Sequence, residues 1–180
     1  MRILGIDPGS NVTGYGVIER DGGRIRHVAH GTLGLARGVP LASRLAALHA
    51  ALGEVIRDHA PDGAVVEQVF VSANARSALV LGEARGVILA AIAGAGVPLF
   101  EYGTRTIKLA VTGSGAAPKP EMQRMVCALL ALEALPAADA ADALAAAICH
   151  LRGAGLPAGA RRRRARGGAR RTGRFVARLG

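Results

Sequence analysis

The sequence predicts a single α/β domain built on a five-stranded mixed sheet with helices on both faces. Three strand-like segments come first, at residues 2–7, 12–19 and 24–35, and turn-forming residues link them as in antiparallel hairpins. Strands then alternate with helices, which is typical of parallel strands joined by crossover helices. The 180 residues are enough for one hydrophobic core and too few for two full lobes.

Turn signals delimit the first three strands. The apolar run from Arg2 to Asp7 ends at the turn cluster Pro8-Gly9-Ser10. Asp21-Gly22-Gly23 is a hairpin signal before the third strand. Gly31, inside that strand, predicts a β-bulge there.

Apolar spacing predicts the first long helix. Side chains recur every three or four residues, as on one face of a helix of about five turns, at Leu41, Leu45, Leu48, Leu52 and Ile56. Asp62-Gly63 ends this pattern, and Ala64 to Glu67 reads as a fourth strand. An Ala/Leu-rich helix over 73–94 and a fifth strand over 97–101 complete the sheet.

The remaining part of the domain is predicted to be helical. Its segments are a short helix at about 104–111, a Gly-, Ala- and Pro-rich loop at 112–120, a helix at about 121–132 and a last helix at about 138–151. Pro118 and Pro120 flank Lys119 and predict that no helix begins before about Glu121.

The positive charge is concentrated at the C-terminus. The net charge is +10, of which the first 152 residues carry +1 and the last 28 carry +9. We therefore divide the chain into a domain at 1–152 and an Arg-rich tail at 153–180, which we expect to be disordered in isolation. The tail is either an extension that reflects gene composition or a segment that contacts DNA non-specifically or docks a partner.

Several classes of protein are excluded by pattern. No run of about 18 uninterrupted apolar residues predicts a membrane span, and Asp7 interrupts any apolar leader, so we expect a cytoplasmic protein without membrane contact. Cys127 and Cys149 lie in Ala-rich helical patterns and are interpreted as small buried residues in a reducing compartment.

Four carboxylates are candidates for chemistry: Asp7, Glu67, Asp139 and Asp142. Asp7 and Glu67 end the first and fourth strands, and Asp139 and Asp142 share a helix face. If these strands are neighbours and the last helix crosses their ends, all four meet. Converging like charges call for a divalent cation, and oxygen ligands favour Mg²⁺ or Mn²⁺. Singly, Asp7 could be a turn residue and Asp139 could stabilise a helix N-terminus.

Short motifs along the chain resemble a known family. They are Ile3-Leu4-Gly5-Ile6-Asp7-Pro8-Gly9-Ser10 with Thr13-Gly14-Tyr15-Gly16, Glu67-Gln68-Val69-Phe70, Asn74 with Ser77-Ala78-Leu79, Leu81-Gly82, Ala84-Arg85-Gly86, Phe100-Glu101-Tyr102 and Ala138-Asp139-Ala140-Ala141-Asp142-Ala143-Leu144-Ala145. In this order and spacing, over about residues 2–151, they resemble the RuvC family of Holliday junction resolvases, which are ribonuclease H-like endonucleases.

The resemblance implies a ribonuclease H-like sheet and a set of four catalytic, metal-binding residues: Asp7, Glu67, Asp139 and Asp142. It also implies two Mg²⁺ ions in each active site, with Mn²⁺ able to replace them. The expected protein is a homodimer that cuts four-way junction DNA symmetrically and works with the RuvA–RuvB branch-migration complex.

The expected DNA-contacting residues are Phe70, Arg76, Lys108 and Lys119. Phe70 and the two lysines match family positions that face DNA, with base stacking and phosphate charge as the physical reasons. The helix at about 73–94 carries more apolar surface than one domain face needs, Leu79 included, and is predicted to supply much of the dimer interface.

Other functions fit parts of the pattern. A related ribonuclease H-like nuclease would cut RNA–DNA hybrids or other branched DNA, and a junction-binding protein without cleavage would lack one of the carboxylates. The first motif also resembles the phosphate loop of actin-like ATPases and sugar kinases, but those enzymes need two lobes to enclose a nucleotide.

Overall fold

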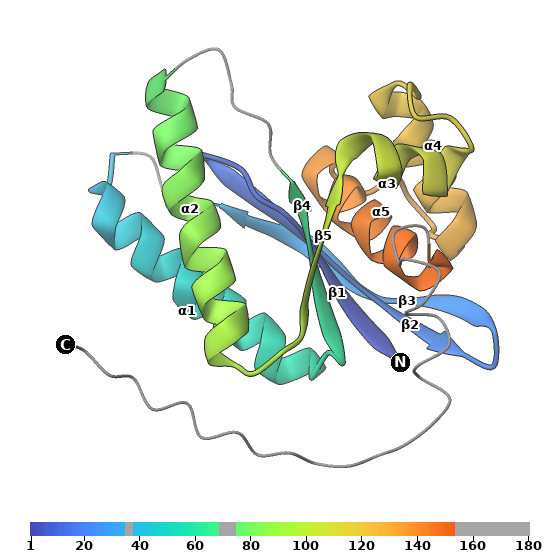
Figure 1. Ribbon diagram of the computed structural model, residues 1–180, viewed down its shortest axis with the longest axis horizontal. Coiled ribbons are helices and arrows are strands. Elements are labelled where there is room, and N and C mark those ends of the chain that lie inside the picture. Colours follow the sequence, from blue (N-terminus) through green and yellow to red (C-terminus); the bar gives the residue numbers. More distant parts are fainter. Residues whose placement is uncertain (35–37, 69–74, 154–180) are drawn as a thin grey trace.

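A computed structural model describes residues 1–34, 38–68 and 75–153, and these form a sheet in the strand order β3-β2-β1-β4-β5 with helices on both sides (Figure 1). The strands are β1 (Arg2–Asp7), β2 (Val12–Asp21), β3 (Arg24–Gly34), β4 (Gly63–Gln68) and β5 (Leu99–Gly103). The helices are α1 (Leu41–His59), α2 (Ala75–Gly94), α3 (Thr104–Thr112), α4 (Lys119–Leu130) and α5 (Ala138–Arg152). The predicted α/β class and mixed sheet are confirmed.

The sheet changes from antiparallel to parallel at β1. This strand pairs antiparallel with β2, and on its other side it pairs parallel with β4, with Ile6 beside Val66. The expectation that the first and fourth strands are neighbours is therefore confirmed. Since they run in the same direction, their C-terminal ends, Asp7 and Glu67, lie at the same edge of the sheet.

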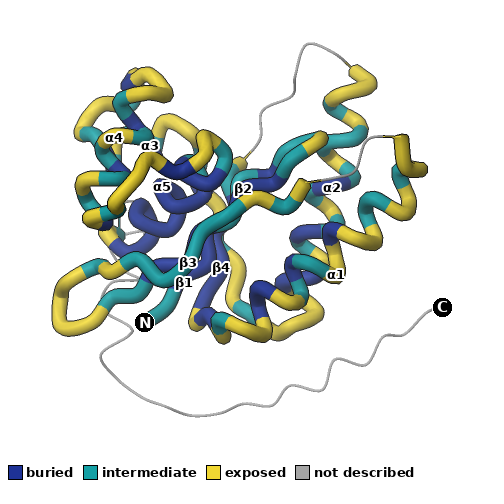
Figure 2. Tube along the Cα trace, turned by 180° about the vertical axis from the view of Figure 1, so that it is seen from behind, coloured by how far each residue is buried: buried dark blue, intermediate teal, exposed yellow. Residues whose placement is uncertain are grey.

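Two apolar cores cover the two faces of the sheet. One lies beneath α1 and α2 and includes Leu4, Val66 and Ile88, whereas the other lies beneath α3, α4 and α5 and includes Ile3 and Val65. Alternate residues of β1 and β4 supply the two cores, as the two-residue period of a strand requires. Buried residues accordingly follow the central strands and most of α5 (Figure 2).

Helix α5 lies unusually close to the sheet because glycines face it. A Cβ at Gly5 would be 1.9 Å from the carbonyl oxygen of Ala143, and a Cβ at Gly14 would be 2.0 Å from that of Asp139. Any other residue at these two positions would push the helix away. The first half of α5, which holds two of the predicted site residues, is thus held directly against β1 and β2.

Three local predictions were wrong. The bulge lies in β3 opposite the Val17–Ile18 step, whereas Gly31 pairs regularly with Tyr15, whose ring occupies the space that a Cβ at Gly31 would need. Strand β5 begins at Leu99, two residues later than expected, because Pro98 has no N–H for the ladder and takes part only through its carbonyl, which accepts the Ala64 N–H.

The double proline does not delay the next helix. Helix α4 begins at Lys119, with Pro118 as its N-cap and Pro120 in its first turn, so the prediction of a start at about Glu121 was wrong. Proline is tolerated there because the first N–H groups of a helix have no partner inside the helix. Lys119 therefore lies at the start of a helix and not within a loop.

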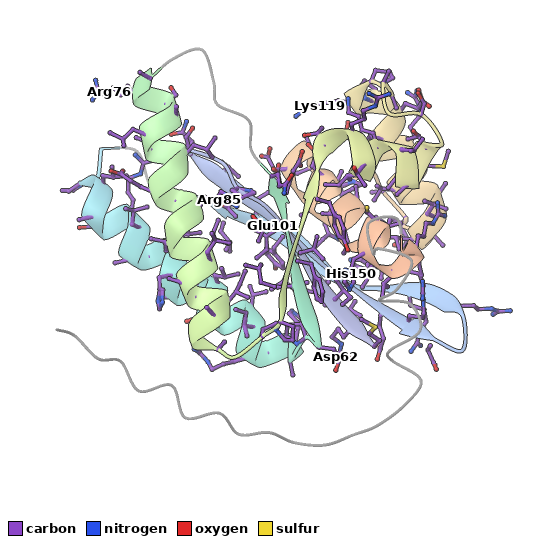
Figure 3. All side chains as sticks on the ribbon, in the orientation of Figure 1. Asp62, Arg76, Arg85, Glu101, Lys119 and His150 are labelled. Carbon is purple, nitrogen blue, oxygen red and sulfur yellow. The ribbon has the colours of Figure 1, made fainter. Side chains whose placement is uncertain are left out.

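Helix α2 is long and apolar enough, by length and composition alone, to cross a membrane. It nevertheless packs on α1 and the sheet through Ala84, Ile88 and Ile92, and Arg85 forms an ion pair with Glu101 of β5 (Figure 3). We interpret α2 as a core helix with an apolar face left open, and on that face Leu79 is 64% exposed. The residues 73–74 of the predicted helix and the predicted tail from 154 onwards lie outside the described residues.

Candidate active site

Asp7 and Glu67 end their strands on the face of the sheet that α5 covers. Ile3 lies four residues before Asp7 in β1, and Val65 lies two residues before Glu67 in β4, so each pair shares a face of the sheet. Ile3 and Val65 are in the core beneath α5. Both carboxylates are partly buried at this edge. A carboxylate that closes a buried strand is costly unless it is paired or binds a cation, so this placement is unfavourable for stability alone.

Helix α5 brings the other two carboxylates to the same edge. Asp139 lies in its first turn and Asp142 lies one turn further, and both are partly buried. Burial is the largest cause that raises the pKa of Asp7, and the charges of Glu67, Asp142 and Asp139 raise it further, so all three lie within electrostatic reach of Asp7. The structure therefore brings together the four carboxylates that the sequence singles out.

Burial and neighbouring negative charges disfavour the charged forms of Asp7, Glu67 and Asp142. Burial and the three neighbouring carboxylates together raise the pKa of Asp7 to about 8. Burial is also the largest cause that raises the pKa values of Glu67 and Asp142. A pocket that resists ionisation of its own carboxylates has a strong attraction for positive charge.

Two lysines face this pocket from the helices beside it. The Nζ of Lys119 lies 3.4 Å from Oδ2 of Asp142, and the pair raises the pKa of Lys119. Lys108 of α3 acts at longer range and opposes the raised pKa values of Glu67 and Asp142. Since the Lys119 side chain is 71% exposed, its ammonium group also faces solvent.

A threonine that the sequence analysis missed also belongs to the site. The Thr104 hydroxyl donates a 2.6 Å hydrogen bond to Oε1 of Glu67. Thr104 begins α3 directly after β5, and β5 pairs with β4 so that Tyr102 is beside Glu67. Strand alternation places Thr104 on the same face as Tyr102, but the register that reveals this contact exists only once β4 and β5 are paired.

The other predicted residues are placed less directly. Arg76 is exposed near the start of α2, and Figure 3 shows it and Lys119 at the same end of the molecule. Phe70 lies outside the described residues. His150 is buried on α5, where its Nδ1 is 2.9 Å from the Tyr102 hydroxyl, so it packs in the core.

The donor set fits a hard divalent cation, although the side chains are not arranged as ligands. In the described parts of the chain, no three His, Cys, Asp or Glu side chains lie close enough together to hold a metal ion as they stand. The carboxylates that converge carry only oxygen donors, and the pKa values of Asp7, Glu67 and Asp142 are raised by burial first and by neighbouring negative charges second, an unfavourable state that a cation relieves.

Comparison with known proteins connects this geometry to a family. The family model described as "Crossover junction endodeoxyribonuclease RuvC" matches residues 3–150. The RuvC protein of Alkalilimnicola ehrlichii is 53% identical over 161 residues, covering 89% of this chain and 97% of that protein. That of Syntrophotalea carbinolica is 51% identical over 150 residues, covering 83% of this chain and 93% of the relative.

Solved structures agree with the sequence matches. Thermus thermophilus RuvC in complex with a Holliday junction substrate superimposes with a TM-score of 0.80 and 34% identity, over 86% of this chain and 94% of that chain. The yeast mitochondrial Holliday junction resolvase shares the fold, with a TM-score of 0.62 and 15% identity over 84% of this chain and 78% of that chain. The match over residues 3–150, together with relatives half identical to it, shows that this chain belongs to the RuvC family of crossover junction endodeoxyribonucleases.

Proposed function

We propose that this protein resolves four-way DNA junctions by metal-dependent hydrolysis of phosphodiester bonds during recombination and DNA repair. The observation that carries the proposal is the convergence of Asp7, Glu67, Asp139 and Asp142 at one edge of the sheet in a member of the RuvC family. Such a carboxylate cluster has little value for folding. It is suited to divalent cations beside a phosphate.

The four carboxylates would hold Mg²⁺, two ions in each site, with Mn²⁺ able to replace them. Bound metal supplies an activated water and stabilises the leaving oxygen of the phosphodiester. Strands β1 and β4 and helix α5 position the four carboxylates that would hold the metal. Thr104 donates its hydroxyl hydrogen bond to Glu67, and this bond opposes the rise in the Glu67 pKa that burial causes.

Cations around the site fit a DNA backbone. Lys119 and Lys108 act on the carboxylates from α4 and α3, and Lys119 is exposed enough to reach a phosphate as well. Arg76 adds an exposed positive charge at the same end of the molecule (Figure 3). Phosphate contacts of this kind give affinity and register without reading sequence. Phe70, two residues after the end of β4 in the sequence, is proposed to stack on a base at the branch point.

We propose that α2 pairs two copies of the chain. Its packed side is formed by Ala84, Ile88, Ala91 and Ile92, and its open side carries Leu79, which is 64% exposed. An apolar face left open on a packed helix is unfavourable in a domain that stays alone and is typical of a partner surface. Two copies would present two sites to one junction in the cytoplasm, with RuvA–RuvB as the proposed branch-migration partner.

The decisive experiment compares substrates in one cleavage assay. A four-way junction, a linear duplex and an RNA–DNA hybrid are incubated with the protein in Mg²⁺, in Mn²⁺ and in chelator. We expect paired, symmetric cuts in the junction only, and none in chelator. Preferred cutting of the hybrid would instead identify another ribonuclease H-like nuclease, and tight junction binding without cuts would identify a junction-binding protein.

A matched pair of variants tests the assignment of the site. Asp7→Asn removes one charge from the carboxylate cluster, whereas Asp58→Asn removes one from the exposed side of α1. Cleavage by the Asp7 variant should fall by orders of magnitude while junction binding survives, since affinity comes from the cations and the shape of the site. The Asp58 variant should cut like the parent. Near-parent cleavage by Asp7→Asn would show that Asp7 is not a metal ligand.

A further inference from the structure

We infer that Thr104 is a positioning residue that sets the orientation of Glu67 for metal binding, an inference that rests on the proposed metal-dependent function. The hydrogen bond from Thr104 Oγ1 to Glu67 Oε1 is 2.6 Å long. That length is typical of a hydroxyl donating to an ionised carboxylate, which is a stronger bond than one between two neutral groups. It uses one carboxylate oxygen and leaves the second for another partner.

The hydroxyl is not needed for the helix that carries it. Threonine at the start of a helix commonly accepts a hydrogen bond from a backbone N–H of the first turn, as an N-cap. Here the N-cap of α3 is Gly103, and no side chain caps the helix. The Thr104 hydroxyl is directed across to β4 instead, so its role concerns Glu67 and not the stability of α3.

Backbone pairing fixes both ends of this contact. Strand β4 pairs with β5 as far as Gln68 and Gly103, and α3 begins at the next residue, Thr104. On the other side of β4, the pairing with β1 extends only as far as Ile6 and Val66. The β5 side therefore holds the end of β4, and Thr104 adds a side-chain constraint on Glu67 where the strand ends.

The charges around Glu67 explain why this constraint matters. Burial raises the pKa of Glu67 and Asp142 raises it further, while the Thr104 hydrogen bond is the largest effect in the opposite direction. Lys108, four residues after Thr104 and so on the same face of α3, adds to that opposing effect at a distance. The hydrogen bond itself carries the inference, because it fixes one oxygen of a proposed metal ligand and so sets the orientation of the Glu67 carboxylate.

The test uses variants that remove or keep the hydroxyl. Thr104→Val has the same shape without the hydroxyl, Thr104→Ser keeps the hydroxyl, and Thr106→Val is the matched control two residues along α3. Two readouts are compared across Mg²⁺ concentrations: the initial rate of junction cleavage, and the melting temperature of the protein without DNA. The second readout reports binding of the ion independently of catalysis.

We expect Thr104→Val to need about tenfold more Mg²⁺ for half-maximal cleavage, and for half of the Mg²⁺-induced rise in melting temperature, since losing such a partner typically costs 10–100-fold in metal affinity or activity. Junction binding in chelator should not change. Thr104→Ser should restore both midpoints, and Thr106→Val should match the parent. Equal Mg²⁺ midpoints for parent and Thr104→Val, or no rescue by serine, would overturn the inference.

Two further outcomes are distinguishable. If the parent does not cut junctions, the proposed function fails, whereas the melting midpoints still decide the role of Thr104. If valine lowers the melting temperature in chelator too far for the assay, Thr104→Ala replaces it, because alanine is well tolerated in a helix. An unchanged Mg²⁺ midpoint for that variant would count against the inference equally.

Discussion

Replacing Asp7 with asparagine is predicted to stabilise this protein when no metal is present. The pKa of Asp7 is about 8 in the folded state, raised from 3.8, with burial as the largest cause and the charges of Glu67, Asp142 and Asp139 after it. Between these two values the folded state holds a proton that the unfolded state releases. The free energy of unfolding therefore falls as pH rises through this window, and it stops falling above about pH 8.

The size of the effect follows from the same two values. At pH 7, which is about 3 pH units above the unfolded-state pKa of 3.8, Asp7 is ionised in the unfolded chain and protonated in the folded chain. At 1.36 kcal/mol per unit, the loss in the free energy of unfolding is at most about 4 kcal/mol. Water that enters the partly exposed pocket lowers this figure, and we expect about 2 kcal/mol. Asparagine cannot ionise in either state, so the variant avoids the whole penalty.

Urea unfolding and thermal melting, both in chelator at pH values from 4 to 8, measure this difference. The Asn variant should match the parent near pH 4, gain stability steadily towards pH 8, and melt about 4–8 °C higher at pH 7. Saturating Mg²⁺ should shrink or reverse the gap, because the parent gains more from binding the ion. A variant that melts well below the parent in chelator, or a gap that does not depend on pH, would refute the repulsion argument.

Three further predictions test the fold, the interface and the tail. Gly5→Ala would place a Cβ 1.9 Å from the Ala143 carbonyl oxygen and should lower the free energy of unfolding, measured by urea titration, by about 3 kcal/mol or more. Gly53→Ala in α1 is the control: its Cβ would meet only the end of the Arg57 side chain, so it should be neutral or stabilising. Leu79→Glu charges an exposed position on α2 and should convert a dimer to monomers in sedimentation analysis; a monomeric parent would contradict the proposed interface. Removing residues 153–180 deletes nine positive charges and should leave cleavage unchanged. The slope of the logarithm of the non-specific DNA-binding constant against the logarithm of the salt concentration should become shallower by roughly 0.9 for each phosphate that the tail neutralises, and an unchanged slope would show that the tail does not bind DNA.

The order of the elements could be predicted because each depends on local signals. Turn clusters, a helical leucine spacing and two β-α-β units predict the order of the strands and helices. The pairing of β1 with β4, which brings the carboxylates at their ends to one edge, was only a condition of the site prediction, and the structure fulfils it. The closeness of α5 to the sheet could not be predicted in the same way. Gly5 and Gly14 make room for α5 only through contacts with residues more than a hundred positions away along the chain.

The Thr104 contact escaped prediction for a related reason. By sequence, residues 97–101 and Leu99–Gly103 are equally typical of a strand. The pairing with β4 begins at Leu99, after Pro98, and only this start fixes the register of β5 against β4. That frame puts Tyr102 beside Glu67 and Thr104 within hydrogen-bonding distance of it. A shift by two residues leaves the faces of a strand unchanged, so the face could be predicted from the sequence while the neighbour could not.

The start of α4 shows how one local rule can mislead about the site itself. Proline inside a helix removes a hydrogen bond, but Pro118 at the N-cap and Pro120 in the first turn of α4 remove none that the helix would have made. Their fixed φ angles favour a helix start on either side of Lys119. The backbone of Lys119 is therefore held in the first turn of a helix, and its Nζ lies 3.4 Å from Oδ2 of Asp142. Its positive charge offsets part of the repulsion among the four carboxylates. The same ammonium group is 71% exposed, so a cation bound by the carboxylates would free it to contact a DNA phosphate beside them.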